Sequence, residues 1–175
     1  MSIHRRDCHR SINVLAQIVD CHMSIESRHY NMAVPVASLQ LYYGMMREEF
    51  KRCLDCEFLL RPEGWYYIGF RQSPELAMHR FTQLGANFDN DAHVIVRVTL
   101  SPLAVAYYTS TLEEGHLNFM PILHKICHKY SNGDTGVWHF TRDMPINVKD
   151  SNDQDLICTE LVNLGHVSAA SGNPC

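Results

Sequence analysis

The chain has 175 residues, a formal net charge of −4 and 46% hydrophobic residues. This length and composition suit one globular domain with a sizeable core. The acidic balance gives no electrostatic support for binding to nucleic acid or to an anionic membrane surface, and no apolar run reaches transmembrane length. Seven irregularly spaced cysteines favour reduced thiols, and no signal-peptide pattern is found. We therefore expect a soluble, intracellular protein of the cytoplasm or nucleus.

The predicted domain occupies residues 36–167. Residues 1–35 are expected to form a peripheral segment with one helix over Ser11–Met23, followed by a linker. Residues 168–175 are small and polar, which predicts a disordered tail.

The domain is predicted to begin with a strand and a helix. Val36–Gly44 has Leu39, Leu41 and Tyr43 on one face, as in a strand, and Met45–Cys56 carries a helical apolar stripe. Phe58–Leu60 is a short apolar run that ends at a turn signal.

The central stretch of the domain is Gly64–Phe88. Its aromatic and β-branched residues from Trp65 to Phe70 predict a strand, in which Gly69 indicates a bulge or a close backbone approach. Ser73 is suited to be the N-cap of a helix with Pro74 in its first position. The stretch thus places tyrosine hydroxyls next to a helix N-terminus, which suits a polar or anionic ligand, although on its own the pattern favours a strand and helix that simply pack together.

Later elements are mostly predicted strands. Leu103–Tyr108 is expected to be a helical turn or a short strand, and Leu117–Tyr130 a helix with Pro121 in its first turn. The predicted strands are Ala92–Leu100, Val137–Thr141, Ile146–Val148 and Leu156–Val162. This order is typical of a mixed α+β fold rather than of regular βαβ alternation.

Two groups of residues are candidates for chemistry. Five aromatic residues could stack on and orient a ligand, or could be ordinary β-formers of a half-buried sheet: Tyr42, Tyr43, Trp65, Tyr66 and Tyr67. Glu160 interrupts the apolar strand LICTELV, so it either faces solvent or acts as a hydrogen-bond acceptor or base.

Metal binding and thiol catalysis are weaker candidates. The residue types that could bind zinc are Cys53, Cys56, His124, Cys127 and His128. Because the cysteine pair lies in a helical pattern rather than a turn, we predict no bound metal. Cys158 and His139 could form a nucleophile pair, but no local signature supports it.

Four segments resemble motifs of the ADP-ribosyltransferase (PARP- and toxin-like) fold superfamily. They are LYYGMMREEF at Leu41–Phe50, GWYYIGFRQSPELAMHRF at Gly64–Phe81, HVIVRVTL at His93–Leu100 and DLICTELV at Asp155–Val162. The resemblance implies NAD as co-substrate, held in the cleft of a split sheet. Tyr43 stands where that family has a histidine or arginine, and it cannot supply a cation.

The resemblance also implies the roles of the remaining site residues. Glu160 would be the catalytic carboxylate, and Tyr66 or Tyr67 would stack on nicotinamide. Gly44 would be the glycine of the first motif, directly after the position where the family has a histidine or arginine. Ser73 would begin the helix of the second motif.

The predicted fold is therefore a single α+β domain with a twisted, split antiparallel sheet and two or three flanking helices. The predicted function is that of a divergent NAD-dependent ADP-ribosyltransferase-like protein acting on a protein or nucleic-acid acceptor. The alternative is a non-catalytic interaction module with an aromatic nucleotide- or peptide-binding cleft, and the exchange at Tyr43 favours it.

Overall fold

A computed structural model describes residues 37–83, 85, 87–110, 120–126 and 136–164. The predictions for residues 1–35 and 168–175 lie outside these ranges. The described helices are α2 (Arg47–Cys56), α3 (Pro74–Gln83) and α4 (Pro102–Ser110). The described strands are β1 (Leu39–Met46), β2 (Phe58–Leu59), β3 (Ile68–Phe70), β4 (His93–Leu100), β5 (Leu123–Ile126), β6 (Val137–Phe140), β7 (Met144–Pro145), β8 (Val148–Lys149) and β9 (Asp155–Leu161). These elements confirm the α+β class.

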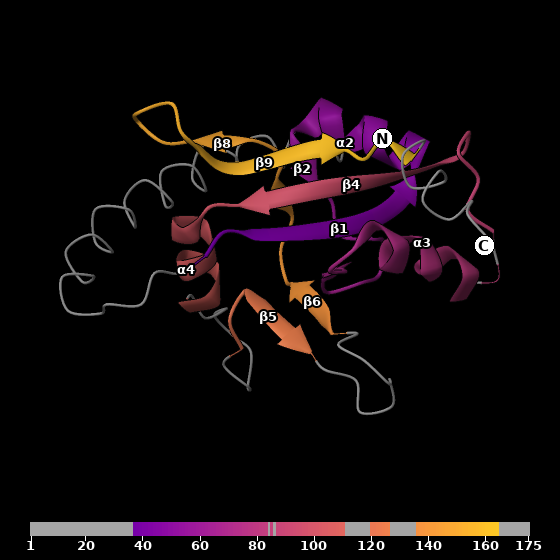
Figure 1. Cartoon of the computed structure of the whole chain (residues 1–175), viewed down its shortest axis with the longest axis horizontal. Helices are drawn as coiled ribbons and strands as arrows, with labels where there is room; N and C mark the ends of the chain where they lie inside the picture. The colour runs from indigo at the N-terminus through magenta and orange to yellow at the C-terminus, as the bar shows by residue number, and fades with distance from the viewer. Residues whose placement is uncertain (1–36, 84, 86, 111–119, 127–135, 165–175) are drawn as a thin grey trace, which may run out of the picture.

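The largest sheet is antiparallel, with the strand order β1-β4-β9-β8. Its central strand β4 has valines that alternate along the chain, and nearly all of its side chains are buried. On β1, Leu41 and Tyr43 are buried on one face, as their spacing in the sequence predicts. Figure 1 shows this sheet across the upper part of the molecule.

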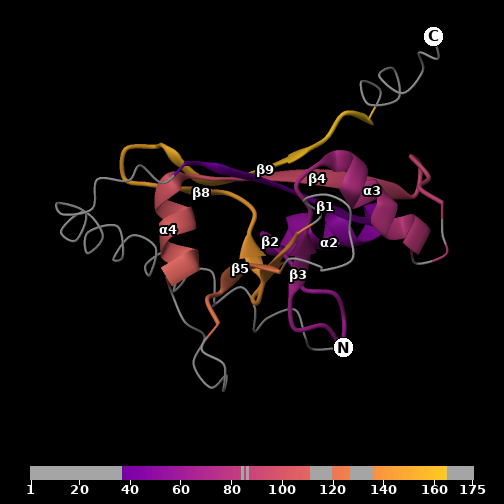
Figure 2. The same cartoon turned by 60° about the horizontal axis from the view of Figure 1, so that its bottom comes forward.

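A second sheet has the order β3-β6-β5, and β2 pairs with β7 in a separate ribbon. One isolated bridge between Tyr42 and Arg71 connects β1 to the residue after β3. Figure 2 shows the four-stranded sheet above and the shorter strands below it. The predicted split sheet is therefore observed, and we call the region where β1 and β3 separate beyond this bridge "the split".

Two hydrophobic clusters hold these layers together. The larger one fills the space between the two sheets, and α2 and α4 contribute Phe50, Cys53 and Tyr108 to it. The smaller one lies on the other face of β1 and β4, where Ala77 and Phe81 of α3 pack against the sheet. Helix α3 therefore covers the face opposite the main core.

Close packing of α3 against β1 requires Gly44. A Cβ atom at this position would lie 2.6 Å from Cε2 of Phe81 and 3.1 Å from the carbonyl oxygen of Ala77. Because real Cβ contacts are longer than this, any side chain here would push the helix away from the strand. The glycine fixes where α3 sits, and so where the split opens.

Several sequence predictions are wrong. The helix predicted over Leu117–Tyr130 is contradicted at Leu123–Ile126, which pairs with β6 as strand β5. A short apolar run of this kind fits either a helix or a strand, and the pairing with β6 decides for the strand. The flanking residues 117–119 and 127–130 lie outside the described part of the chain.

Strand β3, which was predicted over Trp65–Phe70, is also shorter than expected. It begins at Ile68, so Trp65, Tyr66 and Tyr67 lie in the connection before it. Gly69 pairs with His139 in an unbroken register, so there is no bulge, and a Cβ atom there would make only ordinary contacts. Of the two alternatives for Leu103–Tyr108, the helical one is observed, because these residues lie within helix α4.

No helix in the described ranges is long and apolar enough to span a membrane.

Candidate functional site

The split is closed at one end by the bridge between Tyr42 and Arg71. Their backbone groups exchange two hydrogen bonds, each of 2.8 Å. Three residues later Pro74 begins α3, and the Oγ atom of Ser73 accepts a hydrogen bond of 3.2 Å from the backbone N–H of Leu76. The predicted N-cap is therefore confirmed, and the N-terminus of α3 lies close to Arg71.

Arg80 reaches back from α3 to the open edge of β1. Its Nη1 atom donates a hydrogen bond of 3.1 Å to the carbonyl oxygen of Gly44, and its guanidinium carbon lies 4.7 Å from the ring centroid of Tyr43. Tyr43 is 4% exposed, and it meets Phe70 edge-on at 5.8 Å. Burial raises the pKa of the Tyr43 hydroxyl, and the charge of Arg80 opposes this shift.

Arg71 and Arg80 bring two positive charges to β1, because Arg71 is bridged to Tyr42 and Arg80 contacts Tyr43 and Gly44. Burial, and next the charge of Arg80, lower the pKa of the Arg71 guanidinium. No carboxylate in the described ranges forms an ion pair with either arginine. The charge of Arg80 acts on Arg71, so the two guanidinium groups together favour a local positive potential, which an anion would relieve.

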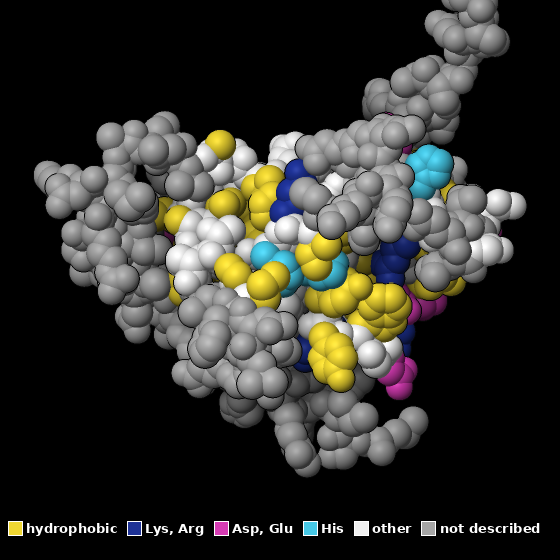
Figure 3. Space-filling model, turned by 90° about the horizontal axis from the view of Figure 1, so that it is seen from below, with side chains coloured by type: hydrophobic (Ala, Val, Ile, Leu, Met, Phe, Trp, Pro, Cys, Tyr) yellow, Lys and Arg dark blue, Asp and Glu magenta, His cyan; other side chains and the backbone are white. Residues whose placement is uncertain are grey.

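The aromatic residues gather on the outer side of the three-stranded sheet. Tyr67 stacks on His139 with ring centroids 3.7 Å apart and an interplanar angle of 8°. Trp65 meets the edge of Tyr67 at 5.6 Å, and His124 meets His139 at 5.5 Å. Figure 3 shows histidine side chains at the centre of this side of the molecule, with hydrophobic and basic side chains around them.

These aromatic rings differ in accessibility. Tyr66 is 77% exposed and Trp65 is 52% exposed, whereas Tyr67 is partly covered by its neighbours. Tyr67 and Arg71 lie at the two ends of β3, directly before and after its three residues. The sheet thus offers planar apolar surface next to positive charge.

Glu160 lies elsewhere. It pairs in register with Arg97, which pairs with Tyr42, so these three side chains share one face of the sheet. Tyr43 is directly opposite Val96 and so projects from the other face. Tyr43 and Glu160 therefore do not line one cleft.

The carboxylate of Glu160 is already paired. Nη2 of Arg97 donates a hydrogen bond of 2.8 Å to Oε2 of Glu160, and the two side chains are 37% and 53% exposed. This hydrogen bond raises the pKa of the Arg97 guanidinium. Of the two readings of this strand residue, the solvent-facing one is thus observed.

The structure therefore brings together most, but not all, of the predicted site. Tyr43 and Gly44 lie on β1, and Tyr67 and Ser73 lie just before and just after the segment that the bridge joins to β1, whereas Tyr66 is exposed and Glu160 lies on β9, two strands from β1. Sequence reasoning missed Arg71 and Arg80. The signal for both was present, because Arg71 ends the aromatic stretch and Arg80 lies two helical turns after Ser73.

The structure also locates the metal and thiol candidates. Within the described ranges, no group of three or more potential ligands is close enough to bind a metal ion. Cys53 is buried in α2, and the Sγ atom of Cys56 lies 3.5 Å from the carbonyl oxygen of Cys53. Cys158 lies on β9 and His139 on β6, in two different sheets. Cys127 and His128 lie outside the described residues.

Comparison of the chain with protein-family models, with curated proteins and with solved structures finds no match.

Proposed function

We propose that this chain is a nucleotide-binding module that holds its ligand at the split. The ligand's phosphates would pair with Arg71 and Arg80, and its base would stack on the exposed ring of Trp65 beside the Tyr67–His139 pair. The observation that carries this proposal is the pair of arginines, which lack a carboxylate partner within the described ranges.

The chemistry of the residues favours this class of ligand. Guanidinium groups bind phosphate through two parallel N–H donors, and each such charge-assisted contact contributes roughly 1.5–3 kcal/mol. The N-terminus of α3, next to Arg71, adds a favourable dipole for a negative charge. Aromatic rings offer surface for a planar base. A nucleotide combines both properties, whereas an uncharged ligand would leave the arginines unused.

Calorimetric titration with ADP, AMP and adenosine tests the proposal. We expect ADP to bind at least about tenfold more tightly than adenosine, because each tenfold step corresponds to about 1.4 kcal/mol and adenosine lacks the phosphates. AMP should lie between the two. Equal affinity for ADP and adenosine would remove the arginines from the site.

NAD-dependent transfer is a second candidate, favoured by one observation. Arg71, Tyr42, Arg97 and Glu160 form a row of directly opposed neighbours on four successive segments. Because directly opposed residues share a face, the carboxylate of Glu160 lies on the same sheet face as Arg71. Three strand spacings separate the ends of the row, about 14 Å, so only an extended dinucleotide could reach both. If transfer occurs, Glu160→Gln should lower NAD turnover roughly 30- to 1000-fold.

A further inference from the structure

A cavity with a volume of 270 Å³ lies between the end of α2 and the segment from β7 to β8. Its lining residues are Leu54, Glu57, Phe58, Pro145, Ile146, Asn147 and Val148. Five of these seven are apolar, and one carries a negative charge. Ligand pockets usually measure about 300–1,000 Å³, so this cavity suits a small ligand.

Glu57 is held in an unusual backbone conformation at this cavity. It follows the last residue of α2 with φ 62° and ψ 22°, a left-handed conformation that glycine adopts more readily than any other residue. Its N–H donates to the carbonyl oxygens of Cys53 and Leu54, and its own carbonyl oxygen accepts a hydrogen bond of 3.1 Å from Ile146. The backbone is thus tied on both sides, which fixes where the side chain starts.

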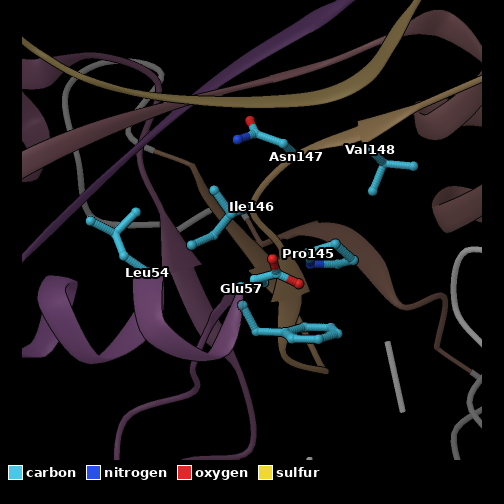
Figure 4. A pocket seen from close by; sticks show the side chains of 7 residues that line it. Leu54, Glu57, Pro145, Ile146, Asn147 and Val148 are labelled. Atoms are coloured by element: carbon cyan, nitrogen blue, oxygen red, sulfur yellow. The ribbon is translucent and has the colours of Figure 1, made fainter. Parts of the chain in front are cut away.

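The carboxylate of Glu57 has no partner in the described part of the chain. The nearby polar groups are engaged elsewhere: Lys149 pairs with Asp153 and Asp155, and Oδ1 of Asn147 accepts from the backbone N–H of Thr159. Figure 4 shows the Glu57 carboxylate beside Pro145, with Ile146 and Asn147 around it. The cavity therefore combines apolar lining residues with one exposed carboxylate at its rim, which has no cationic partner in the described ranges.

We propose that this cavity binds a small organic ammonium ion with an apolar body. The ammonium group would donate charge-assisted hydrogen bonds to Glu57, and the hydrocarbon would pack against Leu54, Ile146 and Val148. Such a ligand uses both features of the cavity, whereas a neutral ligand gains no ion pair with Glu57 and an anion is repelled by it. The cavity shares no lining residue with the split, so this proposal is independent of nucleotide binding.

Ligand-detected NMR titration of the full chain with benzylamine tests the proposal, and benzyl alcohol serves as the neutral isostere. We expect saturable binding of benzylamine that is at least about tenfold tighter than that of benzyl alcohol, as one charge-assisted hydrogen bond allows. Glu57→Gln should remove this preference. Glu48→Gln is the matched control, because Glu48 lies on the same helix and pairs with Lys51.

Leu54→Trp is a second test that leaves the charges unchanged. Leu54 is half-exposed, so a larger ring at this position should fill the cavity without disturbing the core. We expect both probes to lose binding in this variant. Benzylamine affinity that is equal in wild type and Glu57→Gln, affinity that is unchanged by Leu54→Trp, or no saturation in the wild type would each overturn the proposal.

Discussion

Arg97 donates a hydrogen bond of 2.8 Å to Glu160, its directly paired neighbour on the adjacent strand. The residue that the family resemblance implies as catalytic is therefore one half of an exposed cross-strand ion pair. It also projects from the face of the sheet opposite Tyr43, which the same resemblance assigns to the cofactor. Because Glu160 is already paired with Arg97 and lies three strand spacings from Arg71, the proposed ligand site centres on the arginines rather than on Glu160.

Replacing Glu160 with Gln should have little effect. The pair is exposed, and exposed pairs of this kind contribute about 0.2–1 kcal/mol, so the free energy of unfolding in urea should fall by no more than this. The affinity for ADP should change less than about twofold, because no proposed contact is lost. A tenfold loss of ADP affinity would return Glu160 to the site.

Replacing Gly44 with Ala should destabilise the fold. The added methyl group would lie 2.6 Å from the ring of Phe81 and 3.1 Å from a backbone oxygen, and overpacking of this kind costs about 1–3 kcal/mol. Urea unfolding measures the loss. Gly69→Ala is the matched control, since its nearest new contact is 3.4 Å, and its effect should stay below about 1 kcal/mol. Equal effects of the two substitutions would contradict the packing of α3 on β1.

Replacing Tyr108 with Phe should stabilise the protein. The Tyr108 hydroxyl is buried and has no hydrogen-bond partner in the described structure, so its removal should add up to about 1 kcal/mol. Burial also raises the pKa of this hydroxyl above its ordinary value of 10.0. Above pH 10 the unfolded chain therefore loses a proton that the folded chain retains, and the stability of the wild type falls as the pH rises.

The advantage of Tyr108→Phe should consequently be larger at pH 10.5 than at pH 8, as measured by urea unfolding at both values. Tyr66→Phe is the control, because Tyr66 is mostly exposed and its surroundings change little on unfolding. An advantage that does not depend on pH would contradict the burial of the Tyr108 hydroxyl.

Replacing Glu57 with Gly should stabilise the end of α2. Glycine adopts the left-handed conformation at this position without steric cost, so the free energy of unfolding should rise by about 0.5–1 kcal/mol. Glu57→Ala removes the same carboxylate but keeps the Cβ atom, and it should not gain this amount. If alanine stabilises as much as glycine, the gain comes from the charge and not from the backbone.

Local patterns predicted those elements whose residue spacing or capping residues fit only one kind of structure. The alternating valines of β4 and the Ser73–Pro74 start of α3 needed no tertiary information. Strand β5 was missed because a short apolar run fits either a helix or a strand, and only its pairing with β6 decides between the two. A four-residue strand depends on its partner, which sequence spacing does not reveal.

The site was predicted only in part, because it too depends on which segments pair with one another. Tyr43, Gly44 and Tyr67 lie on adjacent segments that the sheet brings together. The face from which Glu160 projects depends on the register of β4 with β9, and a shift of one residue would have reversed it. The role of Arg80 depends on the direction in which α3 returns over β1, which the spacing of residues within the helix does not specify.

The most direct test of the proposed nucleotide site is the affinity for ADP of the wild type and of Arg71→Gln, Arg80→Gln and Arg52→Gln. Arg52 is an exposed residue of α2, so its replacement removes the same charge away from the split. We predict that ADP affinity falls by at least about tenfold in Arg71→Gln and in Arg80→Gln, and by less than about twofold in Arg52→Gln. The same weak affinity in all four proteins, or an equal loss in all three variants, would contradict binding of phosphates at the split.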